Sequence, residues 1–84
     1  MHESESLQLI VGDLLMIQED ESVPKNVKQR IQNAIAILQD VEAKNLNLCI
    51  AKSVQELSDV AEDPNVPRYM QMEILKVVSQ LESK

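Results

Sequence analysis

The segment Glu19-Asp20-Glu21-Ser22-Val23-Pro24 is followed 43 residues later by Glu62-Asp63-Pro64-Asn65-Val66-Pro67, and both read acid-acid-x-polar-Val-Pro. Apolar positions match at the same shift on both sides of these segments. The pairs are Leu7 with Ile50, Val11 with Val54, Leu14 with Leu57, Ile17 with Val60, Val27 with Met70, Ile31 with Ile74, Ala34 with Val77, Ile35 with Val78 and Leu38 with Leu81. The chain is therefore two similar halves, each expected to be a helical hairpin that cannot bury its apolar face alone.

Four amphipathic helices are predicted, over residues 6–20, 24–40, 45–62 and 67–82, because the apolar residues of each stretch share one face at about 100° per residue. The four faces consist of Leu7, Ile10, Val11, Leu14, Leu15 and Ile17; Val27, Ile31, Ala34, Ile35, Leu38 and Val41; Leu46, Cys49, Ile50, Val54, Leu57, Val60 and Ala61; and Met70, Ile74, Val77, Val78 and Leu81. Four such faces predict one shared core. The repeat is interrupted where Ser53 and Ser58 match Ile10 and Leu15.

The two proline turns mark helix starts. Proline fits the first turn of a helix, where a missing N–H costs nothing, and the residues just before, Ser22 and Asn65, have side chains suited to capping. Val23 and Val66 lie four residues before an apolar helix position, as in a hydrophobic staple. Asn45 is the expected boundary of the third helix.

Short connections between these helices predict an all-α, up-and-down, antiparallel four-helix bundle. We expect a single domain, residues 1–84, built from two helical-hairpin repeats at about residues 6–41 and 45–84. A short two-repeat solenoid is the other arrangement that the 43-residue period allows.

Composition agrees with this fold. The 84 residues are 44% hydrophobic and 26% charged, with one Gly, one aromatic residue and no Trp or Phe, which argues against an all-β fold. One cysteine allows no intrachain disulfide and favours a reducing, cytoplasmic compartment. No apolar run approaches the roughly 18 residues needed to span a bilayer, and the acidic N-terminus does not resemble a secretion signal.

The net charge of −6 is unevenly distributed. Residues 1–22 carry six acids and no Lys or Arg, and residues 41–63 are also acidic, whereas residues 23–40 and 64–84 have a small excess of bases. We expect this alternation to favour pairing of the helices within each hairpin. The overall charge disfavours nucleic-acid binding, which depends on Lys and Arg, without excluding it.

Catalytic chemistry is not predicted. His2 lies near the chain end, and Cys49 falls on an apolar helix face, where a thiol is usually inert. One glycine cannot form a Gly-rich phosphate loop, and the chain lacks ligands for a zinc site. The acidic turns are interpreted as solvated, because their spacing matches no calcium-loop motif and Lys25 and Arg68 are adjacent. A hard cation such as Mg²⁺ or Ca²⁺ bound by these carboxylates is the alternative. We expect no enzyme activity, no cofactor and no bound metal.

The candidate interaction surface consists of Lys25, Lys28, Arg30, Arg68 and Tyr69. Tyr69 falls at the edge of its apolar face, where a tyrosine caps a core or anchors a partner. Other apolar residues lie off the predicted core faces and suggest self-association or a partner helix, namely Leu9, Met16, Leu48, Met72 and Leu75. The leading hypothesis is a protein-interaction or adaptor module. The alternative is a ribosome- or RNA-associated accessory protein that uses a basic patch on the second and fourth helices.

The chain also resembles a family of small archaeal proteins known only as uncharacterised. The Asp63-Pro64-Asn65-Val66-Pro67 turn, the Val78-Ser79-Gln80-Leu81-Glu82 ending and Ser22-Val23-Pro24 carry the resemblance, which covers nearly the whole chain. It departs from the family at Gln71-Met72, where a Thr-Arg pair is common. The resemblance implies a bundle with the left-handed twist of bromodomain-like folds, and it implies no activity.

Overall fold

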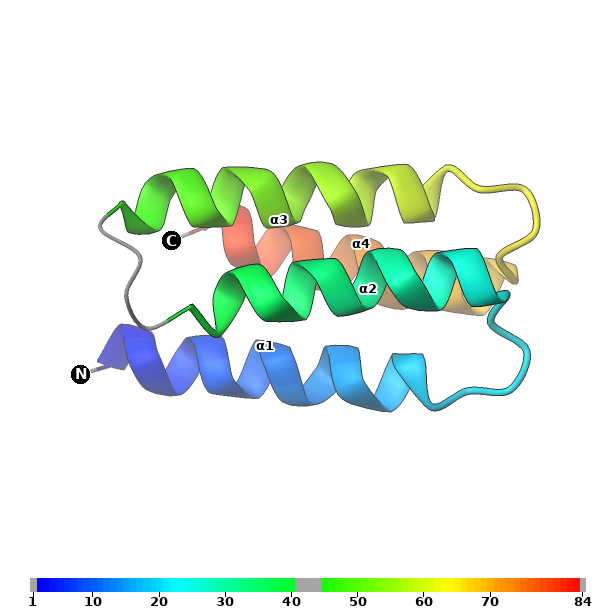
Figure 1. Ribbon diagram of the computed structural model, residues 1–84, viewed down its shortest axis with the longest axis horizontal. Helices are drawn as coiled ribbons and strands as arrows, with labels where there is room; N and C mark the ends of the chain where they lie inside the picture. The colour runs from blue at the N-terminus through cyan, green and yellow to red at the C-terminus, as the bar shows by residue number, and fades with distance from the viewer. Residues whose placement is uncertain (1, 41–44, 84) are drawn as a thin grey trace.

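The computed structural model describes residues 2–40 and 45–83, which form four α-helices (Figure 1). They are α1 (His2–Gln18), α2 (Lys25–Leu38), α3 (Leu46–Ala61) and α4 (Arg68–Glu82), and the described residues include no strand. The predicted all-α class is confirmed. The predicted limits agree to within two residues, apart from the start of α1, which comes four residues earlier. Val41, expected in the core, lies outside the described residues.

The helices form an antiparallel up-and-down bundle. Both chain ends lie at one end of the bundle and both acidic proline turns lie at the other (Figure 1). Helix α2 packs extensively against α3, and α3 against α4, while α1 makes fewer contacts with α2 and α4. Because α1 contacts α4, the four helices close into a ring. This closure distinguishes the bundle from the open solenoid that the repeat also allowed.

The two proline turns share the same pattern of hydrogen bonds to the aspartate side chain and carbonyl. Asp20 Oδ1 accepts from the Ser22 N–H at 2.9 Å, and Asp63 Oδ1 accepts from the Asn65 N–H at 2.8 Å. In each turn the aspartate carbonyl also accepts from the valine N–H, at 3.1 Å in both cases. A carboxylate that binds the backbone two residues on forms an Asx-turn, which reverses the chain in few residues.

The prediction that Ser22 and Asn65 cap α2 and α4 was wrong. The N-cap residues are Pro24 and Pro67, both extended, and no side chain caps either helix. The proline carbonyls instead accept the first helical hydrogen bonds, from Lys28 at 2.9 Å and Gln71 at 3.0 Å. Helices α2 and α4 therefore begin one residue after their prolines. Ser22 and Asn65 lie two residues before those prolines, outside the N-cap position.

The predicted boundary of the third helix at Asn45 is confirmed. Val23 and Val66, expected to act as apolar staples, are buried in the shared core just before α2 and α4. The Asn45 side chain accepts from the Leu48 N–H at 3.1 Å and caps α3. These contacts satisfy a backbone donor and fix the direction in which the chain enters each helix.

A single apolar cluster fills the centre of the bundle. Its fully buried large side chains come from all four helices and include Leu14, Ile31, Ile35, Leu57, Met70, Ile74 and Leu81. Two residues predicted to be in the core lie at its margin, because Leu15 is 42% exposed and Leu46 is 38% exposed. Ser53, which interrupts the repeat, is fully buried, and its hydroxyl donates to the Cys49 carbonyl at 2.9 Å.

Truncating a central core side chain should destabilise the bundle far more than truncating a surface one of the same type. We expect Leu57→Ala to lower the free energy of unfolding by about 2–5 kcal/mol, because it leaves a cavity between packed helices. Leu9→Ala, at a 74% exposed site, should change it by no more than about 0.5 kcal/mol. Urea unfolding measures both, and equal losses would contradict the described core.

Candidate functional site

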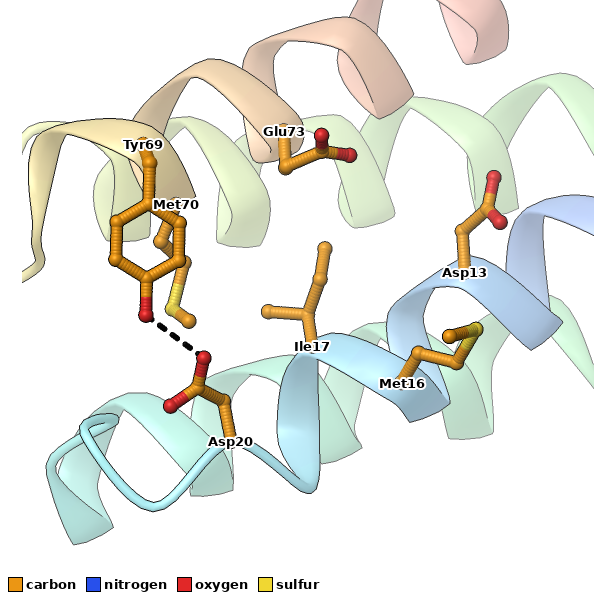
Figure 2. A pocket seen from close by; sticks show the side chains of 7 residues that line it. All are labelled: Asp13, Met16, Ile17, Asp20, Tyr69, Met70 and Glu73. Atoms are coloured by element: carbon orange, nitrogen blue, oxygen red, sulfur yellow. Dashed lines mark hydrogen bonds between the residues drawn. The ribbon is translucent and has the colours of Figure 1, made fainter.

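A cleft of about 330 Å³ lies between α1 and α4, near the end of the bundle that carries the proline turns. Its lining comes from α1, the first turn and α4, and consists of Asp13, Met16, Ile17, Asp20, Tyr69, Met70 and Glu73 (Figure 2). These residues lie at helical spacings of three or four on each side, so each helix contributes one flank. The cleft therefore depends on the α1–α4 contact that closes the ring.

The cleft has an apolar base and acidic edges. Ile17 and Met70 are buried in the core beneath it. Above them, Met16 is 73% exposed and Tyr69 is 57% exposed, and both stand at the edge of the cleft (Figure 2). Three carboxylates complete the lining. Such a surface can hold a group with an apolar body and a cationic end.

Tyr69, the only aromatic residue, joins α4 to the first proline turn. Its hydroxyl donates to Asp20 Oδ2 at 2.8 Å (Figure 2), and the Ser22 hydroxyl donates to Asp20 Oδ1 at 2.7 Å. The two hydroxyl oxygens are 3.0 Å apart. Each hydroxyl has one proton, and both protons point to the ionised carboxylate. The side chain predicted to be a core cap or partner anchor thus fixes the turn.

Hydrogen bonds hold the pKa of the Asp20 carboxyl below its ordinary value. The Ser22 hydroxyl is the largest cause, followed by the Ser22 backbone N–H and then the Tyr69 hydroxyl, with a small contribution from the charge of Lys28. Donors stabilise the ionised form, and this effect outweighs the opposing desolvation. An aspartate is ionised at neutral pH in any case, and here the hydrogen bonds hold its negative charge in place at one end of the cleft.

The other two carboxylates have no basic partner in the described chain. No Lys or Arg nitrogen of residues 2–40 and 45–83 lies within 4.0 Å of Asp13 or Glu73. The described residues also contain no group of three or more His, Cys, Asp and Glu side chains arranged to hold a metal ion.

The five predicted interaction residues lie on α2 and α4, and Arg30 faces away from the cleft. Tyr69 lines the cleft, and Lys28, whose charge acts on Asp20, lies towards α1. Arg30 lies on the other side of α2, where its guanidinium contacts Glu56 at 3.4 Å and Asp59 at 3.3 Å on α3. Lys25 and Arg68 are exposed first residues of α2 and α4.

The Arg30 ion pairs also change the interpretation of the charge pattern. We expected alternating charge to act within each hairpin. The two ion pairs among the described residues instead join α2 to α3, the last helix of one hairpin to the first of the next. In a closed ring every acidic helix has two basic neighbours, so the alternation acts between hairpins as well.

The sequence did not point to Asp13 or Glu73 as site residues. Met70 was predicted to lie in the core but not to line a cleft. Asp13 and Met16 are three residues apart, and Tyr69 and Glu73 are four apart, so each pair was recognisable as one helix flank. No local pattern shows which flank of α1 meets which flank of α4. Cys49 is half-buried on the first turn of α3, towards the other end of the bundle from the cleft.

The fold and cleft define a class: a small, closed four-helix bundle with an acidic, partly apolar cleft at one end. Residues 1–83 match the model of the Uncharacterised protein family UPF0147, and the chain belongs to that family. The family resemblance found in the sequence is confirmed. The family is described as uncharacterised, so membership assigns no function.

Relatives and a solved structure agree in sequence and fold. A UPF0147 protein of Methanosarcina mazei is 34% identical over 80 residues, 95% of this chain and 85% of the relative. One from Aeropyrum pernix is 30% identical over 77 residues, 92% and 84% of the two chains. A crystal structure of a UPF0147 protein from Thermoplasma acidophilum superimposes with a TM-score of 0.87 at 28% identity, covering 99% of this chain and 98% of the other. These relatives are archaeal.

None of the described helices combines the length and the apolar composition that crossing a bilayer requires.

Removing the Tyr69 hydroxyl should weaken the Asp20 network. We expect Tyr69→Phe to raise the pKa of Asp20 towards the ordinary value of about 3.9, because one donor to the ionised form is lost. Carboxyl-detected NMR titration of both proteins measures this change. An unchanged Asp20 titration would show that the hydroxyl does not stabilise the carboxylate.

The same network should make stability depend on pH in a defined direction. Because the folded-state pKa is lowered, its stabilisation is complete above the unfolded pKa of about 3.9 and is lost as pH falls through the lower folded value. Wild type should therefore be more stable than Tyr69→Phe at neutral pH, and the difference should vanish in strong acid. Urea unfolding across that range tests this, and a difference that grows in acid would contradict it.

The Arg30 ion pairs should contribute little to the free energy of unfolding. Since the side chains of Arg30 and Asp59 are about half exposed, we expect Arg30→Gln to cost less than about 1 kcal/mol of unfolding free energy. The loss should shrink as salt rises from about 0.05 to about 0.5 M. A larger, salt-independent loss in urea unfolding would indicate that Arg30 acts by packing.

Proposed function

We propose that this protein is a non-catalytic, cytoplasmic protein-binding module that uses the surface around the α1–α4 cleft. One observation carries the proposal: large apolar side chains are exposed on both sides of the cleft. Met16 and Tyr69 are in its lining, Leu9 precedes Asp13 by one helical turn, and Met72 follows Tyr69 by three residues. Exposed apolar residues that gather in one region are typical of surfaces that bind other proteins.

The sequence of α1 supports this choice. Of the eleven residues from 7 to 17, only three, Gln8, Gly12 and Asp13, are not large and apolar. Packing in the bundle needs one face of the helix, yet Leu9 and Met16 lie on another and remain more than 70% exposed. A helix that only stabilised the bundle would be expected to carry polar residues there.

The RNA-associated alternative receives less support. It needs a continuous basic surface on α2 and α4, because affinity for phosphates comes from Lys and Arg acting together. Arg30 is paired with two α3 carboxylates, and Lys28 lies on the opposite flank of α2. The protein-binding proposal is therefore the stronger of the two.

An NMR experiment with isotope-labelled protein tests the proposal. Adding extract of the native organism should broaden or shift amide signals of α1 and α4 around the cleft. Met16→Gln should weaken the effect, because it replaces an exposed apolar contact by a polar one of similar length. The matched control, Leu48→Gln, alters a half-exposed residue of α3 and should leave the effect intact.

Two results would overturn the proposal. One is a spectrum that does not change in extract. The other is a change that maps to α2 and α3 and is equally strong in the Met16→Gln protein.

A further inference from the structure

The cleft, with a volume of about 330 Å³, has room for a long side chain. Its base is the apolar surface of Ile17 and Met70, and Met16 borders it on the α1 side. Methionine side chains are flexible and adapt to different apolar groups. Lys and Arg bury their aliphatic stems on such surfaces while the charged end remains near polar groups. The apolar base of the cleft matches the aliphatic stem of a Lys or Arg side chain, and the carboxylates at its edges match the charged end.

The charge around the cleft is negative and largely uncompensated. Asp13 and Glu73 have no basic partner within 4.0 Å in the described chain, and the Asp20 carboxylate accepts hydrogen bonds from two hydroxyl groups. Residues 1–22, which include all of α1, carry six acids and no Lys or Arg. Charge complementarity therefore favours a basic occupant.

The exposed apolar residues suggest the shape of that occupant. Leu9 and Met16 are seven residues apart on α1, which places them about 10 Å apart along the helix axis. Partner helices that lie in grooves use apolar anchors at the same intervals of three, four and seven residues. An amphipathic helix laid along α1 would contact both residues and bring its flanking charges to the cleft.

A second copy of this chain fits poorly. A symmetric dimer through the cleft would place the acidic residues of α1 opposite their own copies. An unsymmetrical contact with α2 of another copy would use a helix whose Arg30 already binds Glu56 and Asp59. In that contact the cleft of the second copy would remain empty and could bind a third copy, so the copies would assemble into an open filament.

We propose that the α1–α4 cleft binds a basic amphipathic helix of a protein partner, with a Lys or Arg side chain lying over Ile17 and Met70 and its charged end between Asp13 and Glu73. This inference rests on the proposed function and adds the chemistry of the partner to it. The helix's apolar face covers Leu9 and Met16, and its basic edge faces the carboxylates.

The test uses two designed helical peptides of about 18 residues, or about five turns. Both have the same leucine face, flanked by lysines in one and by glutamates in the other. The lysine peptide, titrated into the labelled full chain, should shift the signals of the cleft residues and bind at least about tenfold more tightly than the glutamate peptide. Added salt should weaken its binding.

Matched variants separate the cleft from the overall charge. The double variant Asp13→Asn, Glu73→Gln should weaken binding of the lysine peptide about tenfold. The control Glu62→Gln, Glu82→Gln removes the same charge from exposed sites outside the cleft and should bind like wild type. Spectra of the free variants verify that both are folded.

The proposal is overturned if both peptides bind equally, if neither binds, if shifts map elsewhere, or if the two double variants lose affinity alike. Any of these results leaves the proposed function standing, provided that extract still perturbs α1 and α4 and Met16→Gln weakens the effect. If extract leaves the spectrum unchanged, the proposed function itself fails. The two failures are therefore distinguishable.

Discussion

The contact between α1 and α4 is the constraint on which the rest of the structure depends. Each hairpin has an apolar face that it cannot bury alone, and α2 against α3 joins the hairpins along one side only. Packing α1 on α4 closes the ring, encloses Leu14 and Ile74 in the core and forms the cleft above Ile17 and Met70. The Tyr69 hydroxyl bound to Asp20 reinforces this contact at the end where the turns lie.

Much of the fold could be predicted because it is encoded locally and then repeated. Apolar periodicity identified four helices and nearly all of the core, and the third helix was correctly predicted to begin at Asn45. The cap prediction at Ser22 failed because the aspartate two residues earlier binds the turn backbone, leaving Pro24 as the N-cap. Local rules thus identified the turn but not which side chain stabilises it.

The candidate site was less predictable because it is formed across helices. Asp13 and Glu73 are unremarkable exposed acids in their own helices, and only the α1–α4 contact places them on one cleft. The basic residues show the converse. Lys28 and Arg30 are two positions apart in sequence, which on a helix puts them about 200° apart, and the structure turns Arg30 to α3. Two basic residues that are close in sequence therefore need not belong to one basic patch.

The helix that closes the ring is also the one that the bundle holds least. Helix α1 contacts its neighbours less than α3 does, and it leaves Leu9 and Met16 exposed. These properties are related, because a helix that used its whole apolar surface for the core would leave none for a partner. A helix bound along α1 and α4 would cover that surface and add contacts across the closure. Since such a partner binds only the folded state, binding would also stabilise the bundle. The repeat supplies the scaffold, and the departure of α1 from a one-sided apolar pattern supplies the exposed apolar surface on which the proposed binding role rests.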